Sequence, residues 1–313
     1  MSANTPAGDL PPEVVEQEEV GRIILRASRR HLPAVGWTWA YYTARSFTCR
    51  LQRPLIDVLF YPEQPASMHY VVWKICAELG IRMTQKPSQR TALAFLWKDA
   101  TSIGASEAAL PATSIPAINA ACRDISKTNV SRHFNAVFGY SCDVDPLSYC
   151  GPCVEKSNRN ARHDGRIVTA PAAAPRAGAV YQRLINNVVP GDLVEDIRVP
   201  VINGVVPFAY LKYRPIAARF DSNRNRTVRL CAAAEVLSED EIRKIGAFAR
   251  SIGLDYGELD VLRDRDDGRI YVVDANKTPA GPSYRLSRTE FRRAVRMLAA
   301  TFRDEFLTAA RSS

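Results

Sequence analysis

The sequence predicts an α/β protein, in the broad sense that includes α+β folds, with two or three subdomains. The chain has 313 residues and is 46% apolar, which is enough for a substantial core. Two apolar strands, at 54–61 and 91–99, flank apolar residues at helical spacing from 71 to 79. This order predicts a βαβ unit and a small parallel sheet. The second half alternates paired strands with two well-capped helices.

Those later elements carry clear local signals. Asn203 and Gly204 predict a tight hairpin turn between strands at 195–202 and 205–215. A capping box, in which a serine and a glutamate three residues later cap each other's backbone, opens each of two helices. The boxes are Ser238 with Glu241 and Ser287 with Glu290.

The charge and the N-terminus limit the functional classes. A net charge of +9 and a pI near 9.3 favour an anionic partner, such as a nucleotide, an acidic substrate or nucleic acid. No run of 18 apolar residues is present, so we expect no membrane span and no membrane partner. Residues 1–22 lack the basic start and apolar centre of a signal peptide, so we expect a loose tail and a cytoplasmic protein.

The seven cysteines are odd in number and scattered, which favours reduced thiols over a disulfide framework. Cys150 and Cys153 spell the redox motif CGPC, but no helix pattern follows them to lower a thiol pKa. A zinc site from Cys142 and this pair, with His133 or His163, is an alternative with nonstandard spacing. The simplest interpretation is the start of a buried strand.

Three polar residues interrupt a predicted hairpin at 257–281. With residues 266–268 as a three-residue loop and Gly268 in the left-handed region, Asp260 lies opposite Asp274. Asn276 comes two residues later and shares the face of Asp274. This register depends on the loop length, because one residue more or less would break the pairing.

Two carboxylates that face each other across a ladder destabilise it unless something compensates. A divalent cation does so, and two carboxylates with an amide oxygen suit Mg²⁺. The alternative is a polar edge hairpin that faces water. It is weakened because the intervening residues, such as Val261, Leu262 and Val272, are apolar on both faces.

The segment LDVLRDRDDGRIYVVDANKTPAG (259–281) resembles the metal-binding hairpin of ATP-grasp enzymes. Asp260, Asp274 and Asn276 match the family's acid on one strand and acid-x-Asn on the next. The family more often has Glu as its second acid, and Pro279 and Gly281 stand one residue further apart than its usual Pro-Gly. The resemblance implies an ATP-grasp fold, in which two α+β subdomains clasp ATP and Mg²⁺ after an N-terminal βαβ pre-ATP-grasp domain.

The likeness covers about residues 119–285 and suggests a division of the chain. The expected parts are a tail and lead-in segment at 1–45, a pre-ATP-grasp domain at 46–118, an ATP-binding lid subdomain at 119–185 and a catalytic subdomain at 186–313.

The resemblance also assigns nucleotide contacts. Lys156 looks like the strand lysine that meets the phosphates, and Lys127 and Lys212 are further cations for the nucleotide. For Lys127 alone, a solvated position is the simpler expectation. Gln182 and Leu184 lie in YQRLI, which resembles the hinge strand that holds adenine.

The strand pair at 195–215 is similar to the RimK-like branch of the family, related to D-alanine–D-alanine ligases. There Arg198 and Arg214 would clamp a substrate carboxylate. The equal alternative is surface pairing of these arginines with Glu195 or Asp196.

Two departures stand out. The loop at 157–166 contains one glycine, Gly165, where the family has a Gly-rich loop over the phosphates. Glu258 occupies a position where some ligases have an arginine that steadies the tetrahedral intermediate, so Arg198 or Arg214 would have to replace it.

Together these features predict an ATP- and Mg²⁺-dependent ligase that joins a carboxylate to an amine through an acyl phosphate, with amino acids or small peptides as substrates. A phosphotransferase on the same scaffold is the first alternative. A basic nucleic-acid-binding protein is the weaker one, because no nucleic-acid-binding module is recognised. A homodimer is compatible with the sequence.

Overall fold

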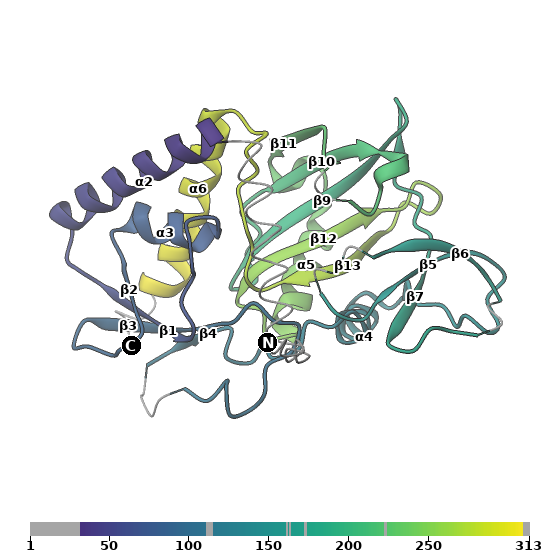
Figure 1. Ribbon diagram of the computed structural model, residues 1–313, viewed down its shortest axis with the longest axis horizontal. Helices are drawn as coiled ribbons and strands as arrows, with labels where there is room; N and C mark the ends of the chain where they lie inside the picture. Colours follow the sequence, from purple (N-terminus) through teal and green to yellow (C-terminus); the bar gives the residue numbers. More distant parts are fainter. Residues whose placement is uncertain are drawn as a thin grey trace, which may run out of the picture.

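Three sheets organise the chain (Figure 1). The computed structural model describes residues 32–110, 115–160, 162, 164–171, 174–221 and 224–308. Within them a four-stranded sheet has the order β2-β1-β3-β4, a three-stranded sheet the order β6-β5-β7, and a six-stranded sheet the order β11-β10-β9-β12-β13 with β8 beside β9. No helix in the described part of the chain is long and apolar enough to cross a bilayer. The predicted α/β class, in its α+β form, is confirmed.

The N-terminal lobe is the predicted βαβ unit with two added helices. Its strands are all parallel, and Gly80 ends the crossover helix with φ 73°. Its elements are α2 (Leu32–Gln52), β1 (Asp57–Pro62), α3 (Val71–Leu79), β2 (Arg82–Thr84), β3 (Thr91–Trp97) and β4 (Ala117–Ile118), with α6 (Arg288–Phe302) returning from the C-terminal end to pack on α3. Of the predicted lead-in segment, residues 1–31 lie outside the described residues and 32–45 lie in α2.

One face of the six-stranded sheet packs against helices, and the other face is buried where it meets the N-terminal lobe. Ile197, Val199 and Val201 alternate along β9 and pack under α4 and α5 with Leu259 and Val261. The elements are α4 (Lys127–Phe138), β8 (Val188–Val189), β9 (Leu193–Ile202), β10 (Ala209–Pro215), β11 (Thr227–Cys231), α5 (Glu239–Ser251), β12 (Tyr256–Arg263) and β13 (Ile270–Asn276). The opposite face carries the polar residues of these strands and faces β5 (Gly151–Ser157), β6 (Arg166–Ala170) and β7 (Ala179–Arg183).

The predicted turns and caps are confirmed. Asn203 and Gly204 both have positive φ between β9 and β10. Both capping boxes are present at the starts of α5 and α6.

The β12–β13 hairpin pairs Asp260 with Asp274 as predicted, but not for the predicted reason. Arg263 pairs with Ile270, so the turn spans residues 264–269 and is longer than the predicted loop. The register then shifts beyond Val261, where Val273 has no opposite residue. This β-bulge adds one residue to β13 and restores the opposition of the two carboxylates.

The loop after β13 is fastened to the N-terminal lobe. Lys74 on α3 is 1% exposed, and its Nζ lies within hydrogen-bonding distance of four carbonyl oxygens, those of Met68, His69, Tyr70 and Gly281. A β-bridge joins Tyr70 to Ala280, and the Val71 amide donates to the carbonyl of Pro279 at 3.0 Å. The buried side chain of Lys74 therefore ties the N-terminal lobe to the segment that follows the β12–β13 hairpin.

We expect Lys74→Met to lower the free energy of unfolding by about 2 kcal/mol, because buried carbonyl oxygens lose their donor. Lys86→Met, at an exposed position, is the control and should change it by less than about 0.5 kcal/mol. Urea titration followed by circular dichroism measures both, and equal stabilities for the two variants would show that the carbonyl cage contributes nothing.

Candidate active site

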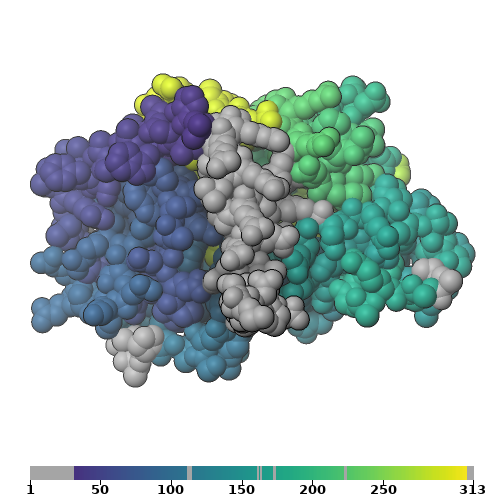
Figure 2. All heavy atoms as spheres, in the orientation of Figure 1, coloured from purple at the N-terminus to yellow at the C-terminus, as the bar shows by residue number. Residues whose placement is uncertain are grey.

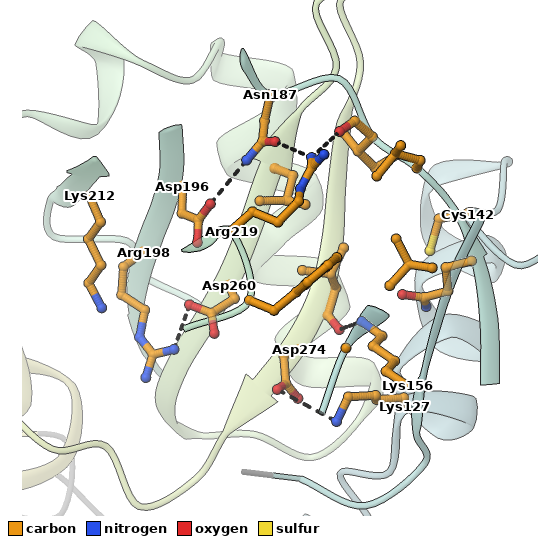
Figure 3. A pocket seen from close by; sticks show the side chains of 18 of the residues that line it. Lys127, Cys142, Lys156, Asn187, Asp196, Arg198, Lys212, Arg219, Asp260 and Asp274 are labelled. Carbon is orange, nitrogen blue, oxygen red and sulfur yellow. Dashed lines mark hydrogen bonds and ion pairs between the residues drawn. The ribbon is translucent and has the colours of Figure 1, made fainter. Parts of the chain in front are cut away.

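A cavity of 380 Å³ lies between the polar face of the six-stranded sheet and the three-stranded sheet (Figure 3). All ten residues predicted for the site line it. They are Lys127, Lys156, Gln182, Leu184, Arg198, Lys212, Arg214, Asp260, Asp274 and Asn276. The structure thus brings together residues that come from seven different elements of the chain and the segment after β7.

Strand alternation explains why the polar residues gather. Side chains two apart on a strand share a face, and directly paired residues of neighbouring strands also share one. Asp274 pairs with Asp260, Asp260 with Arg198, and Asp196 with Lys212. The alternate positions of β9, β10 and β12 point into the core instead. The sheet therefore presents a single charged face to the cavity.

The two opposed carboxylates have different environments. Burial raises the pKa of Asp260, but Arg198 and Lys212 outweigh it and hold the pKa at about 2. Burial raises the pKa of Asp274, and the charge of Asp260 adds to this effect. The nearest cation to Asp274 is Lys127, whose Nζ lies 3.9 Å from Oδ2. Of the two acids, Asp274 thus has the weaker compensation of its negative charge by nearby cations. A bound metal ion would supply the missing positive charge.

Arg198 is held by two carboxylates. Its Nε donates to Glu258 at 2.7 Å and its Nη1 to Asp260 at 2.5 Å. Glu258 is 4% exposed, so it requires this cation. The expected surface pairing of Arg198 with Glu195 or Asp196 is wrong. Glu258, which stands where some ligases have an arginine, instead orients the arginine of the neighbouring strand.

Arg214 belongs to a second, buried cluster. Its three nitrogen atoms donate to Asp196, to Asn225 at 3.0 Å and to the carbonyl of Arg219 at 2.9 Å. Arg214 is 7% exposed, so the pair with Asp196 is not a surface pair as the alternative supposed. These bonds use three of the five N–H donors of the guanidinium and fix its orientation in the cavity wall.

Sequence reasoning missed several cavity residues around that cluster. Asn187 donates to Asp196 at 3.1 Å and accepts from Arg219 at 2.8 Å, and Arg219 also donates to the carbonyl of Ile185. Asn187 and Arg219 match no motif, and only their positions just after the hinge strand and just after β10 could have indicated them. Asn187 and Arg219 fix the segment that follows β7.

The lysines occupy the other end of the cavity. Lys127 begins α4, is 7% exposed and donates to the carbonyl of Arg159 at 2.7 Å. The solvated position expected for Lys127 alone is therefore wrong. Lys156 donates to the carbonyl of Val273 at 3.2 Å, the bulged residue of β13, and burial lowers the pKa of this lysine. The bulge that aligns the carboxylates thus also supplies an acceptor for the strand lysine.

Lys212 projects from β10 beside Arg198 (Figure 3). Within the described part of the chain, no hydrogen bond or ion pair engages its Nζ. Burial, followed by the charge of Arg198, lowers the pKa of Lys212. This lysine is available to an anion in the cavity.

A relay from the N-terminal lobe orients Asn276. Its Oδ1 accepts from the Thr278 amide at 2.9 Å, and Thr278 Oγ1 donates to Asp99 at 2.9 Å. Tyr70 donates to the other oxygen of Asp99 at 2.9 Å. One lone pair of the Asn276 oxygen remains for a metal ion.

Side chains of neighbouring segments hold Gln182 and Arg183 at the end of β7 by hydrogen bonds. Gln182 donates to Asp143 at 3.1 Å, and Arg183 donates to Asp264 at 2.8 Å and to Tyr271 at 2.8 Å. The turn of the β12–β13 hairpin therefore contacts β7, on which Gln182 lies, just before Leu184.

The cysteine alternatives gain no support. Cys153 is buried in β5 and Cys150 is exposed just before it, while His133 lies outside the cavity lining and hydrogen bonds to Ser251. His163 lies outside the described residues. Among the residues the structure describes, no three His, Cys, Asp or Glu side chains are grouped to hold a metal.

No protein-family model matches the chain, and no curated protein matches it by sequence. Solved structures do match. The ATP-grasp ligase PsnB, complexed with minimal precursor, Mg and ADP, is 15% identical over 80% of this chain and 98% of that one, with a TM-score of 0.51. D-alanine–D-alanine ligase from Bacillus anthracis is 14% identical over 83% and 99%, also with a TM-score of 0.51. The chain has the ATP-grasp fold.

In comparisons with two other PsnB structures, the matched part of this chain covers 65% and 62% of the length of the PsnB chain.

The ATP-grasp fold explains the arrangement of the cavity, because its two α+β sheets face each other as the six- and three-stranded sheets do here. The N-terminal βαβ lobe packs beside them. At identities of 15% and 14% the likeness establishes the fold alone.

Arg198→Met should lower the free energy of unfolding by about 3 kcal/mol, because Glu258 is left buried without a cation. The double variant Arg198→Met/Glu258→Gln should recover part of that loss. Arg243→Met, which breaks an exposed pair with Asp240, is the control and should cost less than about 1 kcal/mol. Chemical denaturation measures all three, and an equal cost for Arg198→Met and Arg243→Met would contradict the assignment.

Proposed function

We propose that this protein is an ATP- and Mg²⁺-dependent ligase that joins a carboxylate to an amine through an acyl phosphate. The observation that carries the proposal is the convergence of Asp260, Asp274 and Asn276 with the lysines in one cavity of an ATP-grasp fold. PsnB and D-alanine–D-alanine ligase, which match this fold, are both ligases, and PsnB is complexed with Mg and ADP. We take amino acids or small peptides as the substrate class.

The metal site fits Mg²⁺ by its donor chemistry. Asp260, Asp274 and Asn276 offer hard oxygen ligands on one face, and the raised pKa of Asp274 indicates a negative charge that lacks a full partner. A bound Mg²⁺ would supply charge neutralisation on the phosphate oxygens. Arg198 keeps Asp260 ionised and oriented, and the Thr278 relay does the same for the Asn276 oxygen.

The remaining cavity residues divide into an adenine end and a phosphate end. Gln182 and Leu184 lie at the segment proposed to hold adenine, while Lys127 and Lys156 lie beside Asp274, where the phosphates would sit. Positioning and charge neutralisation are most of what such a transfer requires from a protein.

The substrate carboxylate is assigned to Lys212 and Arg198. Lys212 has an unengaged Nζ, and Arg198 keeps its Nη2 outside the two bonds to Glu258 and Asp260. Arg214, predicted as the second half of the clamp, uses three of its five N–H donors on Asp196, Asn225 and the carbonyl of Arg219, so we propose that it mainly supports the cavity wall through Asp196. Some ligases have an arginine at the position of Glu258 that steadies the tetrahedral intermediate. In this protein we propose that Arg198 has that role.

A phosphotransferase on the same fold is the second candidate. Glu258 favours it, because the position lacks the arginine that steadies a tetrahedral intermediate in some ligases. A ligase would form ADP and phosphate only when an acid and an amine are both present. A phosphotransferase would form ADP with the acid or alcohol alone.

Because all seven cysteines are free thiols, we place the protein in the cytoplasm.

Asp274→Asn should abolish the rise in melting temperature that Mg²⁺ and ATP give together, because binding to the folded state alone stabilises it. Asp304→Asn, at an exposed pair with Arg303, is the matched control and should keep the full rise. Differential scanning fluorimetry with and without EDTA measures the effect. An unchanged rise in Asp274→Asn would contradict the metal assignment.

Lys212→Met should reduce kcat/KM for the carboxylate substrate by about a hundredfold, since it removes a charged contact worth about 3 kcal/mol. The KM for ATP should change much less. Lys244→Met, at an exposed pair on α5, serves as the control. Steady-state assays of ADP release with each substrate varied measure both constants, and equal losses for ATP and carboxylate would move Lys212 to the nucleotide.

A further inference from the structure

An apolar stripe runs along the outer face of α2. Leu32, Trp39, Phe47 and Leu51 are 62%, 60%, 66% and 72% exposed, and their spacing places them on one side of the helix. Across the described residues, nine large hydrophobic side chains are exposed, and five of them lie between Leu32 and Leu55. Such a concentration marks an interaction surface rather than scattered exposure.

The stripe lies at the edge of the molecule, far from the cavity in sequence and fold. Figure 1 shows α2 along the outside of the N-terminal lobe beside α6, and Figure 2 shows its purple atoms at the surface. The opposite side of α2 is already used, because Tyr42 and Cys49 are buried against the lobe. In the described part of the chain, the outer face is the side of α2 that remains exposed.

A row of arginines on α6 runs beside α2. Arg288, Arg292 and Arg296 follow one another at intervals of one helical turn. The guanidinium of Arg288 lies 5.3 Å from the Trp37 ring, and that of Arg292 lies 5.6 Å from the Tyr41 ring. Stacking on these rings holds the charges at a fixed spacing on the flank of α2. The sequence of α2 itself contains no Asp or Glu.

We propose that this surface binds an acidic amphipathic helix of another protein or peptide. Four apolar anchors between Leu32 and Leu51 span about 28 Å, the length of a helix of about 20 residues. Carboxylates at one-turn intervals on the flank of that helix would meet Arg288, Arg292 and Arg296. The net charge of +9 favours the approach of such a partner. This proposal is independent of the ligase activity.

A second copy of the chain fits this surface poorly. In an antiparallel two-fold pairing of α2 with itself, the two arginine rows lie along the same flank and repel. In a parallel pairing, Arg50, which is exposed on the stripe, meets its own copy. A lipid surface could take the apolar residues, but its fluid headgroups gain nothing from arginines held at helical spacing.

The test is binding of a synthetic fluorescein-labelled peptide of about 20 residues, with Leu and Phe on one face and Glu at one-turn intervals beside them, to the full-length protein. Fluorescence anisotropy should show that Phe47→Ser/Leu51→Ser and Arg288→Gln/Arg296→Gln each raise the Kd by about tenfold or more. Leu147→Ser and Arg243→Gln, at exposed sites elsewhere, should leave it unchanged. A peptide of the same composition in scrambled order should bind at least tenfold more weakly.

Thermal unfolding checks that the variants remain folded, which their exposed positions favour. Equal binding of the scrambled peptide, or a Kd unaffected by both double variants, would overturn the proposal. The proposal would also be overturned if the protein co-sedimented with phosphatidylserine vesicles but did not bind the peptide, and if Phe47→Ser/Leu51→Ser abolished this co-sedimentation. A dimer in sedimentation velocity that the same variant dissociates would assign the surface to a second copy instead.

Discussion

The site depends on the opposition of two carboxylates across one β-hairpin. Asp260 and Asp274 face each other on the polar side of the six-stranded sheet, where like charges would separate the strands without compensation. Arg198 compensates Asp260 from the neighbouring strand, whereas the pKa of Asp274 is raised by burial and lacks an equally close cation. This imbalance is what makes the pair a metal site in our account.

Several distant segments hold that pair in place. The bulge at Val273 sets the register of the carboxylates, and its carbonyl accepts from Lys156 on the facing sheet. The N-terminal lobe fixes the other end of the hairpin through Lys74 and through the relay from Asp99 to Thr278 and Asn276. These contacts connect the N-terminal lobe directly to the residues of the proposed metal site.

The sequence predicted the elements with strong local signals better than the details of pairing. The βαβ unit, the turn at Asn203 and Gly204 and both capping boxes are present because each depends on neighbouring residues alone. The hairpin register was right although the loop length was wrong, since no local signal marks a bulge at Val273. The alternative pairing of Arg214 with Asp196 is present but buried, and the partners of Arg198 were not predicted, because burial and cross-strand neighbours decide both.

The central claim is that three side chains of one hairpin hold the metal of a nucleotide complex. A crystal structure with Mn²⁺ and a non-hydrolysable ATP analogue, using the anomalous signal of manganese, tests it most directly. We predict a metal within about 2.2 Å of oxygen atoms of Asp260, Asp274 and Asn276, bridged to the phosphates. A nucleotide bound with its metal elsewhere, or with Asp274 turned away from it, would contradict the account.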